Sequence, residues 1–222
     1  MKNKQLIIKI VVAVLLTVGV ASFFIRPKAT AIIINEPSDK EISFRDLNLE
    51  AKSAIVYDPI NNEIIFDKNS NSQLPIASLT KIMTALVASE KLNNEVPVEI
   101  TADAIRKFGD YGFQVGEKWR LRDLLDYTLV TSANDGAEAL AQAFTPADHT
   151  AAELMNSRAG ELDLDQTYFT NPTGLDYLDK LPSAQSSAYD LSRLFAHILK
   201  TKPEIFEATT HESVNVTSLD QN

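Results

Sequence analysis

Residues 76–88 read IASLTKIMTALVA, a run of good helix formers whose apolar residues fall on more than one helical face. A short helix that is apolar nearly all round is expected inside a domain rather than on its surface. Ser78 opens this predicted helix, and Lys81 follows one turn later on the same face. A hydroxyl and an amine held together in an apolar wall indicate an activated nucleophile. A helix-capping serine beside a snorkelling lysine would give the same pattern, so the segment alone leaves both interpretations open.

The composition excludes several kinds of chemistry. The 222 residues fit one large domain or slightly more, and 45% of them are hydrophobic, which is enough for a substantial core. The chain has no cysteine, which excludes disulfides, thiol nucleophiles, thiolate metal sites and iron–sulfur clusters. Its three histidines are far apart and lack metal-ligand spacing, so we expect surface or capping roles for His149, His197 and His211.

The first 31 residues have the pattern of an export signal. Lys2, Lys4 and Lys9 precede a charge-free apolar run over residues 10–25, and an A-x-A triplet ends at Ala31. The run is slightly long for a cleaved signal and short for a comfortable membrane span. A cleaved signal peptide and an uncleaved membrane anchor with its N-terminus inside therefore both remain open. Either way, the rest of the chain is expected to work outside the cytoplasm.

The exported part of the chain is strongly acidic. Of the 21 lysines and arginines, five lie in the first 31 positions, which contain no acidic residue. The remaining 16 face all 30 acidic residues, a net charge of −14. So acidic a surface argues against nucleic acid as a partner, because the phosphate backbone is bound mainly through positive charge.

Beyond the export segment, residues 32–50 predict a tether and residues 51–222 a folded domain. Two β-rich runs at residues 54–57 and 63–66 are separated by DPINN, which predicts a hairpin. Four helical patterns follow the central helix, near residues 121–129, 137–144, 151–162 and 188–199. The extended-looking residues 213–216 suggest the beginning of another strand. A two-stranded hairpin is not a stable sheet by itself, so the pattern predicts a sequence that is cut short.

A second polar group lies between two predicted helices, where residues 132–134 read SAN. Serine and asparagine before Asp135 and Gly136 are well suited to end one helix and cap the next, so the triplet alone means little. Its combination with S-x-x-K on a core helix, after a hairpin and an export signal, is more informative. S-x-x-K, S-x-N and K-T-G together form the set typical of β-lactamases and penicillin-binding proteins.

From about Ser53 to Asn222 the chain resembles the low-molecular-mass penicillin-binding proteins, which are serine D-alanyl-D-alanine carboxypeptidases. The resemblance rests on segments that occur in one order: LPIASLTKIMT (74–84), VGEK (115–118), DLL (123–125), SAND (132–135), FTNPTGLD (169–176) and SAYDL (187–191). It implies an α/β (α+β) fold of the β-lactamase/transpeptidase type. This fold has an antiparallel sheet, a central nucleophile helix and an all-helical subdomain, and the C-terminal strands of the sheet would be missing from this chain.

The resemblance also implies a mechanism and a substrate. Ser78 would attack the carbonyl between the two D-alanines of a peptidoglycan stem peptide and form an acyl-enzyme, which β-lactams would trap covalently. Lys81 would be the general base, which requires its pKa to fall by about 3 units from ~10.4, on the order of 4 kcal/mol. Burial and a second nearby cation are the available causes. Ser132 would relay the proton, Asn134 would bind the substrate amide and orient Lys81, and no metal or cofactor would be needed.

The third motif of this family, K-T-G, is missing from the sequence. Residues 200–202 read KTK and lie at the end of the predicted fourth helix, while Thr173-Gly174 is preceded by Pro172 instead of lysine. The resemblance places K-T-G beyond Asn222. We therefore interpret the chain as an N-terminal fragment that is not expected to turn over as it stands.

Three alternatives share some of these features. A class A β-lactamase has the first two motifs but needs a glutamate to activate the deacylating water, and Glu161 is the candidate. An endopeptidase that cuts cross-links would use the same residues as the carboxypeptidase. A non-catalytic scaffold associated with the cell wall would explain the missing third motif, but it would have no use for the four residues Ser78, Lys81, Ser132 and Asn134.

Overall fold

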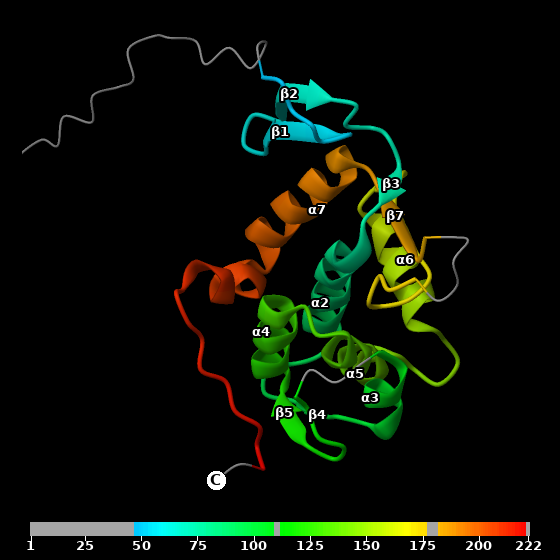
Figure 1. Ribbon diagram of the computed structural model, residues 1–222, viewed down its shortest axis with the longest axis vertical. Helices are drawn as coiled ribbons and strands as arrows, with labels where there is room; N and C mark the ends of the chain where they lie inside the picture. Colours follow the sequence, from blue (N-terminus) through cyan, green and yellow to red (C-terminus); the bar gives the residue numbers. More distant parts are fainter. Residues whose placement is uncertain (1–46, 109–111, 177–181, 221–222) are drawn as a thin grey trace, which may run out of the picture. The chain divides into compact units, whose positions relative to one another are not determined.

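The buried helix predicted from residues 76–88 is present as α2 (Thr80–Lys91), preceded by the 3-10 turn η2 (Ala77–Leu79). In the computed structural model, which describes residues 47–108, 112–176 and 182–220, nine of the twelve residues of α2 are buried. Figure 1 shows α2 in the middle of the helical block, with α4, α5, α6 and α7 around it. The all-round burial explains why its sequence is apolar on several faces.

The predicted hairpin is confirmed. Strands β1 (Ala54–Asp58) and β2 (Glu63–Lys68) pair antiparallel, with an irregularity between Val56 and Tyr57. The Asp58 carboxylate stabilises the turn by accepting hydrogen bonds from the backbone amides of Ile60 (2.8 Å) and Asn61 (3.2 Å). This is the turn chemistry that the DPINN sequence predicts.

The predicted helices are also confirmed, with small changes of boundary. They are α4 (Leu121–Thr131), α5 (Asn134–Phe144), α6 (Ala151–Glu161) and α7 (Ala188–Thr201), and they are accompanied by α3 (Ala102–Phe108) and the 3-10 segment η3 (Pro203–Thr210). The capping box at the start of α6 is complete. The Glu153 amide donates to Thr150 Oγ1 (3.2 Å), and the Thr150 amide donates to the Glu153 carboxylate (2.7 Å).

Two small antiparallel sheets bring distant segments together. In one, β3 (Leu74–Pro75) pairs with β7 (Ala184–Ser186), which also pairs with β6 (Tyr168–Phe169). In the other, β4 (Pro97–Glu99) pairs with β5 (Lys118–Arg120). The first sheet matters for function, because it places the segment after β6 next to the start of α2.

Two sequence-based expectations concern other parts of the chain. Residues 213–216 form no strand, contrary to the expectation, because no described segment offers them a partner for a ladder of hydrogen bonds. The predicted export segment lies outside the described residues, so the division into signal, tether and domain stays a prediction. Within the described ranges, no helix has both the length and the apolar character needed to cross a membrane.

Candidate active site

Ser78 and Lys81 form a hydrogen-bonded pair at the junction of η2 and α2. Lys81 Nζ donates to Ser78 Oγ (3.0 Å) and to the backbone carbonyl of Thr173 (3.0 Å). Only 2% of Lys81 is exposed, so its amine lies in the interior and does not reach solvent as a snorkelling lysine would. The geometry favours the nucleophile–base interpretation of the S-x-x-K motif over the capping one, since Ser78 makes no side-chain cap of the helix.

Burial changes the protonation chemistry of this lysine. Loss of solvent lowers the pKa of the Lys81 amine from its ordinary 10.5 to about 8. The direction is the one that a general base requires, because an amine must be neutral to accept a proton. Burial is the cause, so the lowering does not depend on the second cation that the sequence interpretation also considered.

Ser132 lines the same cavity as this pair. It ends helix α4 in the left-handed conformation (φ 59°, ψ 35°), a region that residues other than glycine adopt infrequently. A cavity of about 430 Å³ is lined by Ser78, Lys81 and Ser132, and its apolar walls come from Ile76, Leu79, Ile82, Leu129, Phe195 and Phe206. The structure thus brings three of the four predicted site residues together.

The fourth predicted residue, Asn134, is placed differently. It is the first residue of α5, is 8% exposed, and is not among the residues that line the cavity. Asn134 follows Ser132 by two positions, across the short connection between α4 and α5. Its role toward a substrate amide stays a prediction.

The segment after β6 contributes to the site, and the sequence interpretation did not assign it a role there. The Thr173 carbonyl accepts the hydrogen bond from Lys81, and Gly174 (φ +76°) lies against the turn before Ser78. A Cβ on Gly174 would come within 1.9 Å of the Ala77 carbonyl oxygen, so only glycine fits there. Ala77 itself has a positive φ of 44°, which makes the turn before the nucleophile a strained one. Proline, asparagine and glycine favour a turn at NPTG, but its partner on α2 cannot be inferred from these residues.

The alternative site residues lie elsewhere. Glu161, the candidate for a β-lactamase, ends α6, where its carboxylate binds Arg158 (2.9 Å), and it does not line the Ser78 cavity. Lys200 and Thr201 lie in the last turn of α7, as the sequence predicted, and so cannot supply a K-T-G strand. The described residues also contain no group of three or more side chains suited to hold a metal ion.

Two of the histidines have ordinary polar partners. His149 Nδ1 lies 3.0 Å from the carboxylate of the adjacent Asp148 on the surface. His197 Nε2 lies 3.2 Å from the Arg158 guanidinium, which also binds Glu90. His149 thus has the surface role expected of it, whereas His197 lies partly buried inside α7 against Arg158 and caps no helix.

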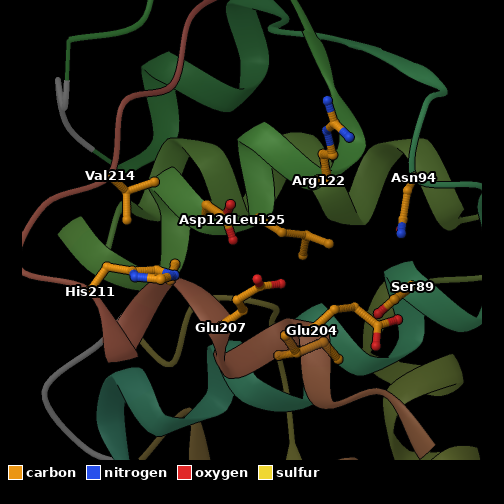
Figure 2. A pocket seen from close by; sticks show the side chains of 11 residues that line it. Ser89, Asn94, Arg122, Leu125, Asp126, Glu204, Glu207, His211 and Val214 are labelled. Atoms are coloured by element: carbon orange, nitrogen blue, oxygen red, sulfur yellow. The ribbon is translucent and has the colours of Figure 1, made fainter. Parts of the chain in front are cut away.

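A second pocket of about 400 Å³ lies between α4 and η3 (Figure 2). Figure 2 shows Asp126 and Glu207 on opposite walls with their carboxylates turned toward each other. Burial, with the negative charges of Asp123 and Glu207, raises the pKa of Asp126. The other side of η3 provides Phe206 to the Ser78 cavity, so the two hollows share this element as a wall.

A comparison with protein families places these features in context. Residues 39–222 match the family model described as D-alanyl-D-alanine carboxypeptidase, peptidase S11. The chain belongs to this family. The match covers every element described above and therefore includes the Ser78–Lys81 pair and the α4–α5 turn.

Relatives of known sequence agree with the family assignment. The chain is 33% identical over 161 residues to the D-alanyl-D-alanine carboxypeptidase DacF of Bacillus subtilis, covering 70% of this chain and 40% of that protein. It is 30% identical over 169 residues to a D-alanyl-D-alanine endopeptidase of Pseudomonas aeruginosa, covering 75% of this chain and 53% of that protein. The chain thus spans about half the length of these relatives.

Solved structures confirm the fold class. The D-alanyl-D-alanine carboxypeptidase of Mycobacterium tuberculosis superposes with a TM-score of 0.68 at 28% identity, covering 74% of this chain and 61% of that one. Penicillin-binding protein D2 of Listeria monocytogenes, solved in its ampicillin-bound form, superposes with a TM-score of 0.62 at 32% identity, covering 77% and 70%. The mixed α/β architecture is therefore that of the penicillin-binding proteins, as the sequence resemblance implied.

Proposed function

We propose that the chain carries the nucleophile and base of a serine D-alanyl-D-alanine carboxypeptidase, which trims the terminal D-alanine from peptidoglycan stem peptides. The observation that carries this proposal is the hydrogen bond of 3.0 Å from the buried amine of Lys81 to the hydroxyl of Ser78, which is exposed. Family membership supports the reaction class, and the cavity beside the pair offers room for a peptide. The export pattern of the first 31 residues supports action outside the cytoplasm, where peptidoglycan lies.

The proposed reaction begins with proton transfer from Ser78 to neutral Lys81. Ser78 Oγ forms a bond to the carbonyl carbon between the two D-alanines, and the backbone amide of Ser78 stabilises the developing oxyanion. The C–N bond then breaks, and the proton passes through Ser132 to the leaving amine of the last D-alanine. Water hydrolyses the acyl-enzyme and restores Ser78. Asn134 would hold the substrate amide in this scheme.

A β-lactam should enter the same path and stop at the acyl-enzyme. The Listeria monocytogenes relative was solved in ampicillin-bound and cefotaxime-bound forms, which supports β-lactams as ligands of this site. Because a β-lactam stops at the acyl-enzyme, penicillin labelling is a more direct test of Ser78 than turnover of a peptide.

The proposal can be tested by covalent labelling of source-cell membranes with fluorescent penicillin, read on a denaturing gel. The Ser78→Ala variant should lose the labelled band. Ser89→Ala is the control, because Ser89 is a buried serine on α2, the helix that follows Ser78, and its hydroxyl donates to the Ala85 carbonyl; this variant should keep the band. A band that survives in Ser78→Ala, or no band from the unmodified protein, would contradict the proposal.

A related activity has a specific observation in its favour. Some relatives are D-alanyl-D-alanine endopeptidases, one of them 30% identical to this chain, and the chemistry at Ser78 would be the same. The two reactions differ in the leaving group. Free D-alanine released from a linear stem peptide would support the carboxypeptidase, whereas cleavage only of cross-linked dimers would support the endopeptidase.

A further inference from the structure

Residues 171–175 fold around a single buried side chain. Asn171 Oδ1 accepts hydrogen bonds from the Thr173 amide (3.0 Å), the Thr173 hydroxyl (3.0 Å) and the Gly174 amide (2.8 Å). Its Nδ2 donates to the Leu175 carbonyl (2.9 Å). Asn171 is 4% exposed, so water offers little replacement for these bonds. The side chain of Asn171 therefore determines the local backbone, including the direction of the Thr173 carbonyl.

Helix α2 binds this segment at two successive carbonyls. Thr84 Oγ1 donates to the Pro172 carbonyl (2.7 Å), and Lys81 Nζ donates to the Thr173 carbonyl (3.0 Å). Lys81 and Thr84 lie one turn apart on the same face of α2. Thr84 and Thr173 are both fully buried. The spacing of the two donors matches two consecutive acceptors, which holds the segment in register with the helix.

The position of the Thr173 carbonyl has a direct effect on the amine. A neutral amine has two N–H donors and one lone pair, and it acts as a base only when the lone pair faces the proton to be removed. A carbonyl that accepts one N–H restricts the rotation of the amine and helps to direct the lone pair toward Ser78 Oγ. In the charged form, the same carbonyl replaces part of the solvation that Lys81 loses on burial.

We propose that Asn171 is a positioning residue for Lys81, because it holds the Thr173 carbonyl where that carbonyl accepts the hydrogen bond from the amine. This inference rests on the proposed function, since it gives Asn171 a part in the activation of Ser78. Asn171 does not contact the reacting atoms itself. It acts through the Thr173 carbonyl by shaping the segment after β6, while Lys81 and Thr84 join that segment to the nucleophile helix.

The test uses two variants, one control and two measurements. Asn171→Ala removes the side chain that shapes the segment, and Thr84→Val removes the second attachment to α2 without changing the shape of the side chain much. Asn156→Ala is the control, because Asn156 likewise bonds to backbone groups of the neighbouring Phe169 (2.8 and 2.9 Å). The measurements are the pH profile of acylation by fluorescent penicillin and the titration of Lys81 by NMR of ¹³C-labelled lysine, assigned with Lys81→Met.

In Asn171→Ala, acylation should slow by about 10- to 100-fold, because small misplacements of a reacting group have effects of this size. The pKa of Lys81 should fall by about one unit below its value of about 8, because the ammonium loses an acceptor while it stays buried. Thr84→Val should change both measurements in the same direction by less. Asn156→Ala should change neither.

Other outcomes would overturn the inference. A rise of the Lys81 pKa toward 10.5 would mean that the segment only excludes water, and an unchanged titration in both variants would mean that Asn171 does not act on Lys81 at all. If Asn171→Ala does not fold, Thr84→Val alone decides by the same criteria. If the unmodified protein in source-cell membranes is not acylated, the proposed function fails, but the NMR titration still decides this inference because it requires no reaction.

Discussion

At the scale of single residues, the surroundings of Lys81 set the protonation and the hydrogen bonds that its amine needs to act as a base. Its burial is nearly complete, its pKa is lowered to about 8, and its hydrogen bonds run to Ser78 and Thr173. With that pKa, about one-tenth of the amine is neutral at pH 7. This fraction is enough for a base that is regenerated in each cycle, and it increases as the pH rises.

The lowered pKa predicts opposite effects of Lys81 on activity and stability. Acylation of Ser78 should become faster with pH up to about 8 and then level off, because the neutral amine is the base. In the unfolded chain the pKa returns to about 10.5, so the folded chain binds fewer protons between pH 8 and 10.5, and stability should rise with pH through that window. Lys81→Met should therefore abolish acylation yet stabilise the fold at pH 7 by about 1–3 kcal/mol. Denaturant unfolding at pH 7 and pH 10 measures this, and a destabilised Lys81→Met at pH 7 would contradict it.

Ser132 allows its backbone and hydroxyl to be tested separately. Its φ of 59° costs an L-residue about 1–2 kcal/mol, and glycine adopts this conformation freely. Ser132→Gly should keep or raise the melting temperature while it slows acylation by about 100-fold, because the relaying hydroxyl is lost. Ser132→Val should likewise slow acylation, but unlike Ser132→Gly it should lower the melting temperature, since a β-branched residue fits this conformation poorly. Acylation of Ser132→Gly at the unmodified rate would show that the hydroxyl has no part in the reaction.

At the scale of elements, the site depends on close contact between the segment after β6 and the turn η2. Gly174→Ala would force a Cβ to within 1.9 Å of the Ala77 carbonyl oxygen and 2.5 Å of Thr80 Oγ1. We expect it to destabilise the chain by more than about 2 kcal/mol and to slow acylation, because the strained turn before Ser78 must move. The control is Gly160→Ala in α6, where a Cβ meets nothing within 4 Å and helix propensity should add about 0.5–1 kcal/mol. Thermal unfolding distinguishes the two, and equal melting temperatures would contradict the close packing.

Elements with a strong local pattern could be predicted from the sequence, and those that depend on distant partners could not. The apolar run of α2 and the DPINN turn each contain the information that specifies them. By contrast, α3 lies in a polar, glycine-punctuated region where no periodicity predicted a helix. The bond from Lys81 to Thr173 joins residues 92 positions apart, and the bond from Thr84 to Pro172 joins residues 88 positions apart. Local chemistry predicts a turn at NPTG, but the helix that the turn contacts is determined by the whole fold.

At the scale of the whole molecule, the described elements differ in how firmly they are held. The described residues from Asn48 to Asp220 pack as one unit, and most of its buried residues belong to α2, α4 and α5 and their neighbours. The β1–β2 hairpin contains no fully buried residue, and Val56, Ile64 and Ile65 remain exposed. A two-stranded ladder without a buried face has little stability of its own. Its order therefore depends on the elements that it contacts.

This difference predicts a gradient of amide exchange across the chain. Amides of β1 and β2 should exchange at least about 100-fold faster than those of α2, because a weakly buried ladder opens without unfolding the core. The hairpin contacts α7 through the edge-to-face pair of Tyr57 and Tyr189, with ring centroids 6.3 Å apart, and the Tyr189 amide also donates to the Ser70 carbonyl (3.0 Å). Tyr189→Ala should therefore speed exchange in the hairpin further and leave α2 unchanged. Hydrogen exchange followed by NMR or mass spectrometry measures both, and equal protection of the hairpin and α2 would mean that the strands unfold only together with the nucleophile helix.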